Sequence, residues 1–147
     1  MYQRILVATD GSNLSKKAIK AALGLAGTCQ ADLVAVRVIP RYVQTYFEGS
    51  MPLDPKSVSQ IEDQWKAEAE KSLAQVAKAG KAQQVPTQTL VVKGQSVADA
   101  LIQTAKKTKC DLIVMASHGR KGLSKLLLGS ETQHVLTHAH IPVLVLR

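Results

Sequence analysis

Aromatic residues are scarce in this chain, whose 147 residues include one Trp, three Tyr and one Phe. Proteins that hold single-stranded nucleic acid stack the bases on aromatic rings, so this shortage weighs against such a partner. Acidic residues are also few, with 11 Asp and Glu against 19 Lys and Arg, and the formal net charge is +8 at pH 7. The basic residues are scattered over several expected helices instead of forming one stripe. We therefore interpret them as solvated helix faces and expect no nucleic-acid partner.

Cysteines and long apolar runs are equally limited. The two cysteines, Cys29 and Cys110, have neither CxxC nor zinc-finger spacing, and each precedes an expected strand. We expect both to be small buried thiols in a reducing compartment. No apolar run approaches the roughly 20 residues that span a bilayer, so we expect no membrane partner. The first residues enter a strand pattern without a signal-peptide core, which predicts a cytoplasmic protein.

The chain does contain a regular succession of strand-like and helix-like segments. Its apolar runs are rich in Val, Ile and Leu and mostly continuous, as in parallel strands buried on both faces. The expected strands are Arg4–Ala8, Asp32–Ile39, Thr87–Val92, Leu112–Ala116 and Val143–Leu146. Segments with helical spacing lie between them, at about Ser15–Ala26, Lys56–Ala79, Ser96–Lys107 and Glu131–His138. This order predicts one α/β domain over residues 1–147, an open Rossmann-like sheet of five parallel strands with helices on both faces.

The longest expected helix and the loop before it stand out. The helix is expected to face inward with Ile61, Trp65, Ala69, Leu73, Val76 and Ala77. The loop, residues 40–55, is long enough to be a functional lid. Its aromatic residues Tyr42, Tyr46 and Phe47 could cover a base or pack on the edge of the sheet, and the sequence leaves both interpretations open.

Two strand ends carry the residues best suited to a ligand. In open α/β sheets, ligands bind beyond the carboxyl ends of strands where the strand order reverses. Residues 8–12, ATDGS, follow the first strand, and residues 115–119, MASHG, follow the fourth. Asp10 there could accept hydrogen bonds from ribose hydroxyls or cap the next helix, a role that Ser12 could also take. We favour the ligand role.

The segment after the fourth strand predicts a phosphate cradle. Gly129 and Ser130 stand where the last helix is expected to begin. Glycine lets backbone N–H groups approach a ligand closely, and a helix N-terminus offers unpaired donors and the positive end of a dipole. The usual nucleotide motifs are missing, because there is no GxxxxGK[ST] and no GxGxxG after the first strand.

Several segments together resemble the universal stress protein family over nearly the full length of the chain. They are ILVATDGS, VRVIP, VVKGQSVADALI, CDLIVMASHGRKGLSKLLLGSETQHVL and the closing IPVLVLR. The ATP-binding branch of that family has the pattern G-x2-G-x9-G-[ST]. Here Gly119, Gly129 and Ser130 match its spacing, but Ala116 stands where the first glycine is expected. The resemblance implies an adenine nucleotide alpha hydrolase-like fold.

The resemblance also implies where a nucleotide would bind. Asp10 would take the ribose, Val38 would meet the adenine through its backbone, and Gly119, Gly129 and Ser130 would hold the phosphates. The full set of implied nucleotide-binding residues is Ala8, Thr9, Asp10, Val38, Met115, Ala116, Ser117, His118, Gly119, Arg120, Gly129, Ser130, Glu131 and Thr132. The implied ligand is ATP, ADP or AMP, with Mg²⁺ held through its phosphates. His118, Arg120 and Lys121 could add positive charge there or be exposed turn residues.

The methyl group of Ala116 is the main departure from the family pattern. It costs little if the backbone at residue 116 is ordinary, and about 1 kcal/mol or more if φ must be positive. We expect weakened or unaltered nucleotide binding, and not its loss.

Catalytic and metal-binding patterns are poorly represented. The sequence suggests no Ser/His/Asp set and no acid–base pair, so we expect a nucleotide-responsive binding module with at most slow ATP hydrolysis. His134 and His138 have ligand-compatible spacing, with His140 close behind, but no further metal ligand can be placed. The alternatives are a family member that binds no nucleotide, and an enzyme of related architecture such as a flavoprotein-like or nucleotide-transferring protein.

The last apolar segment, residues 141–146, is expected to be an edge strand. An exposed apolar edge is normally covered or paired. The family resemblance implies that two copies form a homodimer through this strand and act in stress tolerance. A charge at Val143 or Val145 would then yield monomers.

Overall fold

The computed structural model describes residues 1–42, 51–119 and 127–147 of the chain. The strands are β1 (Arg4–Ala8), β2 (Asp32–Ile39), β3 (Thr87–Lys93), β4 (Leu112–Ala116) and β5 (Val143–Leu146). The helices are α1 (Asn13–Cys29), α2 (Pro55–Ala82), α3 (Val97–Lys107) and α4 (Ser130–His138). The predicted strands and helices are thus confirmed, with shifts at several helix ends. None of the described helices is long and apolar enough to cross a membrane.

Local capping explains where α1 and α2 begin. The Ser12 hydroxyl accepts the Ser15 backbone N–H at 3.1 Å, so α1 starts two residues earlier than the apolar spacing suggested. Asp54 caps α2 in the same way by accepting the Ser57 N–H at 2.8 Å, and Pro55 occupies the first turn, where its missing N–H costs nothing.

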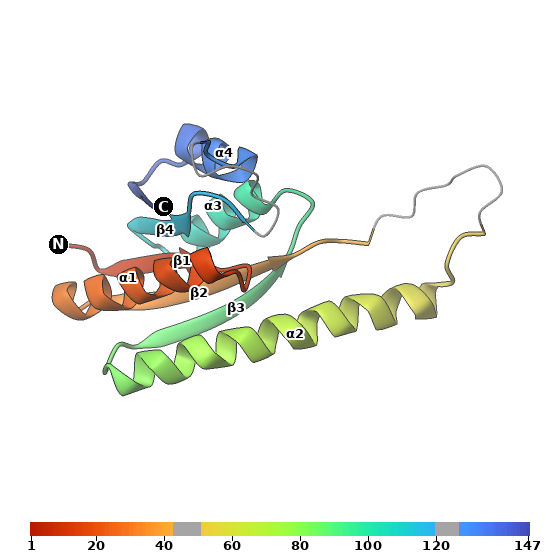
Figure 1. Cartoon of the computed structure of the whole chain (residues 1–147), viewed down its shortest axis with the longest axis horizontal. Coiled ribbons are helices and arrows are strands. Elements are labelled where there is room, and N and C mark those ends of the chain that lie inside the picture. The colour runs from red at the N-terminus through yellow and green to blue at the C-terminus, as the bar shows by residue number, and fades with distance from the viewer. Residues whose placement is uncertain (43–50, 120–126) are drawn as a thin grey trace.

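The five strands form one parallel sheet in the order β3-β2-β1-β4-β5 (Figure 1). The chain builds outward from β1 to β3 and then returns to β1 to place β4 on its other side. The strand order therefore reverses between β1 and β4, as predicted for the binding edge. β5 pairs with β4 and lies at the edge of the sheet, which confirms its predicted position.

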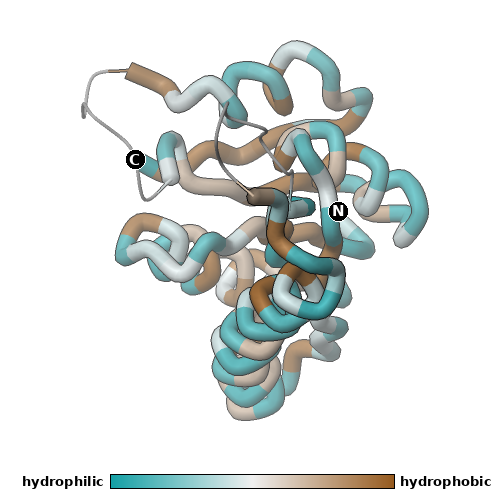
Figure 2. The backbone as a smooth tube through the Cα atoms, turned by 90° about the vertical axis from the view of Figure 1, so that its right-hand side faces the viewer, coloured by the Kyte–Doolittle hydropathy of each residue, from teal (hydrophilic) through white to brown (hydrophobic). Residues whose placement is uncertain are grey.

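Alternation along the strands divides the core into two layers. Ile5 and Val7 of β1 pack with α1 and α2, whereas Leu6 packs with α3 and α4. In the same way Leu33 and Ala35 of β2 face the first pair of helices. Each helix shows apolar and polar residues in alternation along its length, as expected for one buried face (Figure 2). The carboxyl edge of the sheet is therefore open on two sides, one toward α1 and α2 and the other toward α3 and α4.

The first half of α2 corrects the sequence prediction. Ala69, Leu73 and Val76 are buried as expected, but Ile61 and Trp65 are only half-buried. The reason is that α2 extends beyond the end of the sheet, so that its first turns have no strand beneath them (Figure 1).

The start of the 40–55 loop is tied to α2 and β3. The Tyr42 backbone N–H donates to Glu62 Oε1 at 3.2 Å, and Lys93 Nζ lies 2.7 Å from Glu62 Oε2. The hydrogen bond from Lys93 holds the pKa of the Glu62 carboxyl below its ordinary value. The other aromatic residues of the loop, Tyr46 and Phe47, lie outside the described residues.

Both cysteines are free thiols. Cys110 is buried as expected, whereas Cys29, at the end of α1, is only half-buried. Burial raises the pKa of the Cys110 thiol, although the nearby Thr108 hydroxyl, 3.2 Å from the sulfur, opposes the shift.

Candidate functional site

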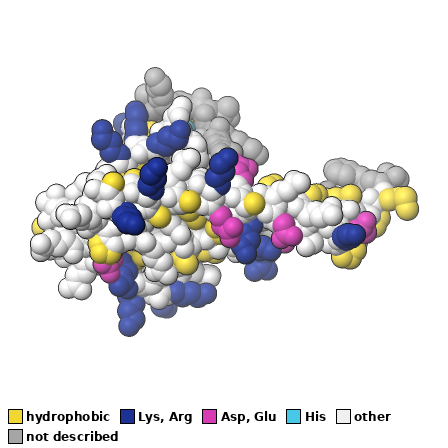
Figure 3. All heavy atoms as spheres, turned by 90° about the horizontal axis from the view of Figure 1, so that it is seen from below, with side chains coloured by type: hydrophobic (Ala, Val, Ile, Leu, Met, Phe, Trp, Pro, Cys, Tyr) yellow, Lys and Arg dark blue, Asp and Glu magenta, His cyan; other side chains and the backbone are white. Residues whose placement is uncertain are grey.

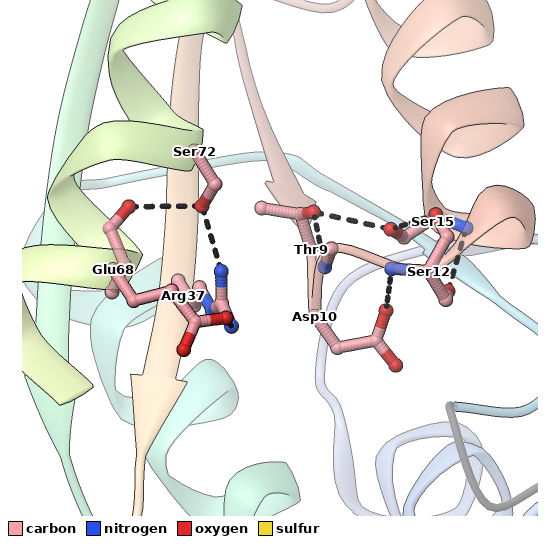
Figure 4. A network of polar contacts seen from close by, with 9 residues as sticks. Thr9, Asp10, Ser12, Ser15, Arg37, Glu68 and Ser72 are labelled. Atoms are coloured by element: carbon pink, nitrogen blue, oxygen red, sulfur yellow. Dashed lines mark hydrogen bonds and ion pairs between the residues drawn. The ribbon is translucent and has the colours of Figure 1, made fainter.

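The turn between β1 and α1 presents a fixed carboxylate. Asp10 Oδ1 accepts the Ser12 backbone N–H at 2.8 Å, and the Thr9 hydroxyl accepts the Gly11 N–H at 3.2 Å (Figure 4). Gly11 has a φ of 79°, a conformation that favours glycine, and it lets the chain turn sharply into α1. Because Ser12 is the helix cap, Asp10 is not needed for that role.

The end of β4 is joined closely to the start of α4. The Gly129 N–H donates to the Ser117 carbonyl at 2.7 Å. The buried Thr132 hydroxyl lies 3.1 Å from the Ala116 carbonyl oxygen and 3.0 Å from that of Ser117. These bonds fix the first turn of α4 against the strand end, although nine residues separate Gly119 from Gly129 in the chain.

Two glycines stand where a Cβ would crowd atoms of another segment. A Cβ on Gly119 would stand 2.8 Å from Asp10 Oδ2, and a Cβ on Gly129 would stand 3.3 Å from the Cα of His118. Gly129 has φ −62° and ψ 154°, which any residue can adopt, so space and not conformation selects glycine there. The two glycines therefore allow close packing of residue 119 beside Asp10 and of residue 129 beside Ser117 and His118.

The N-terminus of α4 offers hydrogen-bond donors at this convergence. Gly129 is the N-cap residue, and no side chain caps this helix among the described residues. The first N–H groups of a helix lack partners within it, and the positive end of the helix dipole lies there. An anion is therefore favoured at this point.

A cavity of about 190 Å³ opens beside these elements at the carboxyl edge of the sheet. It contains most of the residues predicted from the sequence: Ala8, Thr9, Asp10, Val38, Met115, Ala116, His118, Gly119, Glu131 and Thr132. Ser117, which is 5% exposed, lies behind its wall and contacts His118 Nδ1 through its hydroxyl at 3.1 Å. Gly129 and Ser130 lie outside the lining, at the start of α4. Arg120, like Lys121, lies outside the described residues.

Sequence reasoning missed four lining residues. They are Ser15, Val36, Val97 and Leu101. Strand alternation could have found Val36, because it shares a face with Val38, and helical spacing could have paired Val97 with Leu101. Together with Met115, the valines and Leu101 make one side of the cavity apolar.

Glu131 has a structural role that its sequence position did not indicate. Its Oε2 accepts the Ala98 backbone N–H of α3 at 2.7 Å. A carboxylate at a helix N-terminus satisfies an otherwise unpaired donor and complements the dipole. Glu131 thus connects α4 to α3 and lines the cavity at the same time.

The backbone at Ala116 is ordinary. Residue 116 ends β4, where it pairs with Leu146, and it is absent from the described residues with positive φ. The methyl group therefore causes no backbone strain. The structure therefore supports the expectation that the methyl group of Ala116 costs little free energy.

The histidines of α4 are engaged with other groups. His134 Nε2 lies 2.9 Å from Asp99 Oδ1, and the rings of His134 and His138 stack with centroids 4.2 Å apart. His138 Nδ1 contacts the His134 carbonyl oxygen at 3.0 Å. Within the described residues, no three His, Cys, Asp or Glu side chains are placed to hold a metal ion.

The residues around the cavity suit a nucleotide in three ways. The apolar side can hold a base, the Asp10 carboxylate can accept from sugar hydroxyls, and the first turn of α4 adjoins the cavity through Glu131 and Thr132. A Cβ at Gly119 would crowd Asp10 Oδ2, so glycine keeps the approach to that carboxylate open.

Known proteins share this sequence and fold. The whole chain, residues 1–147, matches the model of the universal stress protein family. Universal stress protein MJ0531 of Methanocaldococcus jannaschii is 34% identical over 149 aligned residues, which span 100% of this chain and 83% of that protein. The structure of UspA from Lactobacillus plantarum is 27% identical and has a TM-score of 0.86, covering 99% of this chain and 98% of its own. A universal stress protein in complex with cAMP is 26% identical with a TM-score of 0.69, covering 98% and 95%. The chain therefore belongs to the universal stress protein family.

Proposed function

We propose that this universal stress protein binds an adenine nucleotide, ATP or else ADP or AMP, in the cavity between β1, β4 and α3. The observation that carries the proposal is the single cavity lined together by Asp10 of the β1–α1 turn, Gly119 after β4 and the first turn of α4. A Cβ at Gly119 would crowd the Asp10 carboxylate, and the adjoining helix N-terminus favours an anion. The relative solved with cAMP supports an adenine nucleotide as the ligand.

Each part of the nucleotide has a matching set of residues. The base would lie against Val36, Val38 and Leu101, and the ribose hydroxyls would donate to Asp10. The phosphates would lie over Gly119 and the first turn of α4, where Ser130 offers a hydroxyl and a backbone N–H. Mg²⁺ would bind through the phosphates, as it usually does in proteins.

The protein would bind the nucleotide as a signal and would hydrolyse it slowly at most. The cavity lining contains two carboxylates, and both have partners in the fold: Asp10 holds the turn and Glu131 caps α3. Neither is arranged as one member of an acid–base pair. We therefore propose a nucleotide-responsive module for stress tolerance in the cytoplasm, with at most slow hydrolysis of ATP.

We further propose that two copies pair through β5. β5 pairs with β4 on one side, and no described strand covers its other side. Leu144 is 40% exposed on this strand. Exposed apolar edge strands are normally paired or covered, and a second copy would do so symmetrically.

The nucleotide proposal is tested by identifying what the protein carries and what it binds. Mass spectrometry of ligand released from the purified, denatured protein should find an adenine nucleotide, or calorimetry should show saturable binding of ATP, ADP or AMP. GTP, whose base has a different hydrogen-bonding edge, should bind more weakly. A protein that releases no nucleotide and binds none of the three would be the family member without nucleotide binding.

A further inference from the structure

A second cavity lies on the opposite face of the same sheet edge, between α1 and α2. Its volume is about 370 Å³, within the range typical of small-molecule sites. Its charged lining residues are Lys16, Arg37, Glu68 and Lys71. Thr9 is the one described residue that it shares with the nucleotide cavity. The two cavities are therefore separate sites on either side of the sheet.

Arg37 is the unusual residue of this cavity. Strand alternation places it on the face where Leu33 and Ala35 belong to the core, and its side chain is 11% exposed. Nη1 donates to the Ser72 hydroxyl at 2.9 Å, and Nη2 donates to Glu68 Oε1 at 3.2 Å (Figure 4). Withdrawing a guanidinium from water is costly, and an apolar side chain would extend the core more cheaply. Its presence here points to a use for a fixed positive charge.

Among the described residues, the charge that lines the cavity is mainly positive. Lys16 of α1 and Lys71 of α2 add two more cations to Arg37, whereas Glu68 is the one acid among the described lining residues. Viewed from the side of α2, Lys and Arg side chains flank the helix (Figure 3). The described lining of the cavity therefore carries excess positive charge.

Part of the remaining lining is apolar, and it consists of Ile19 of α1 and Val76 and Ala79 of α2. A bare inorganic ion would leave the half-buried Ile19 and Ala79 in contact with water, whereas an apolar group attached to the ion would cover them. Both features together describe a ligand with an apolar body and a negatively charged end.

We propose that this cavity binds a small organic anion, a compact apolar body that carries one phosphate or carboxylate group. The anionic end lies near Arg37, Lys16 and Lys71, and the apolar body covers Ile19, Val76 and Ala79. Phosphate and carboxylate each offer two oxygen atoms that can accept a pair of parallel hydrogen bonds from a guanidinium. The site is independent of nucleotide binding on the other face.

The site is tested by ¹H–¹⁵N NMR titration of the full-length chain with phenyl phosphate, benzoate, inorganic phosphate and benzyl alcohol. Phenyl phosphate or benzoate should give saturable shifts at the amides of Gly11, Lys16, Ser72 and Gln75. The dissociation constant of the organic anion that binds should be at least about tenfold below that of benzyl alcohol, which lacks the charge. The anion that binds more tightly identifies the charged group of the natural ligand.

Matched double variants locate the charge. Lys16→Gln with Lys71→Gln should weaken binding of the anion about tenfold, as expected for losing two partly solvated charge contacts. Lys17→Gln with Lys78→Gln removes the same charge from exposed positions on the same helices and should leave the affinity unchanged. Neither pair lies in the nucleotide cavity, so ATP affinity should be similar in both.

Five results would overturn the proposal. Four are the absence of saturable shifts with either organic anion, shifts confined to Gly119 and Gly129, equal affinity for benzyl alcohol, and equal effects of the two double variants. The fifth is binding of inorganic phosphate as tight as that of phenyl phosphate, because the apolar body would then contribute nothing. Failure of the organic-anion proposal would not affect the nucleotide proposal, because ATP affinity is measured in a separate titration.

Discussion

Asp10 and Gly119 stand at the ends of two neighbouring strands, so close that a Cβ on Gly119 would lie 2.8 Å from Asp10 Oδ2. The strand order reverses between β1 and β4, which is why these two ends face one another. The two strand ends thus bring the Asp10 carboxylate beside residue 119 in the lining of one cavity. The proposed nucleotide site is built around it.

Replacing Gly119 with alanine tests whether the close approach of residue 119 to Asp10 matters for ATP binding. The new methyl group would push the Asp10 carboxylate aside, so Gly119→Ala should lower ATP affinity about tenfold, the equivalent of about 1.4 kcal/mol. Stability should change by less than about 1 kcal/mol, because Gly119 is exposed and the displaced atom ends a short side chain. Calorimetry and thermal unfolding measure the two effects.

Gly24→Ala is the matched control for a glycine replacement. A Cβ at Gly24 would meet nothing within 4 Å, and the residue lies inside α1. The control should raise stability by about 0.5–1 kcal/mol through helix propensity and leave ATP affinity unchanged. Equal ATP affinity in Gly119→Ala and the parent would mean that the position of Asp10 does not matter for binding.

Asp10→Asn tests which part of the nucleotide Asp10 contacts. The amide oxygen can still accept the Ser12 N–H, so the turn should be retained. Loss of the charged acceptor should weaken ATP binding by about tenfold to a hundredfold, as expected for a hydrogen bond to a charged group. Affinity for 2′,3′-dideoxy-ATP should barely change, since that nucleotide has no ribose hydroxyls to donate. An equal loss for both nucleotides would remove Asp10 from the ribose.

Much of this fold was predictable because its strands are buried on both faces. Continuous runs of Val, Ile and Leu, such as residues 32–39 and 112–116, have few other structures available to them. Helix ends were less predictable, since α1 begins where Ser12 caps it and not where the apolar spacing starts. The exposure of Ile61 and Trp65 depends on how far α2 outruns the sheet, which no local pattern encodes.

The candidate site was predictable where motifs follow strand ends and unpredictable where packing brings helices together. Asp10 and Gly119 were found because they follow strands that meet. The Glu131–Ala98 contact depends on how α3 and α4 pack, across 33 residues of sequence. Arg37 drew no prediction from the sequence, because its neighbours Glu68 and Ser72 come from a helix more than 30 residues away.

Ala116→Gly tests the departure from the family pattern. Because residue 116 has an ordinary strand backbone, removing the methyl group relieves no strain. ATP affinity should stay within about twofold of the parent, and stability should fall by about 0.5–1 kcal/mol because glycine is more flexible in the unfolded chain. Calorimetry that shows much tighter ATP binding would instead mean that the methyl group obstructs the ligand.

We expect the buried Cys110 thiol to lower the free energy of unfolding as the pH becomes alkaline. Burial raises its pKa in the folded chain, so its contribution is complete below the ordinary thiol pKa and is lost as pH rises through the higher folded value. Denaturant unfolding between pH 7 and about pH 10, which spans the ordinary thiol value, should show a steeper loss in the parent than in Cys110→Ala. Cys29→Ala should follow the parent, because Cys29 is only half-buried. Parallel curves for parent and Cys110→Ala would contradict this assignment.

Leu144→Lys tests pairing through β5. A charge at this exposed edge position should oppose association, and sedimentation should show monomers. The charge is better placed here than at Val143 or Val145, whose side chains pack against the core of the sheet. Leu136→Lys, on a leucine of similar exposure in α4, should remain a dimer. A dimer that persists in Leu144→Lys would place the interface elsewhere.

The central claim, that an adenine nucleotide binds beside Asp10, Gly119 and Gly129, is tested most directly by calorimetric titration of ATP into the parent and Gly129→Val. A valine at residue 129 would crowd the backbone of Ser117 and His118, whose atoms lie 3.3–3.4 Å from the position of its Cβ. With folding of both proteins confirmed by circular dichroism, we expect saturable binding to the parent and at least about tenfold weaker binding to the variant. Equal affinity in the two proteins, or no binding to the parent, would contradict it.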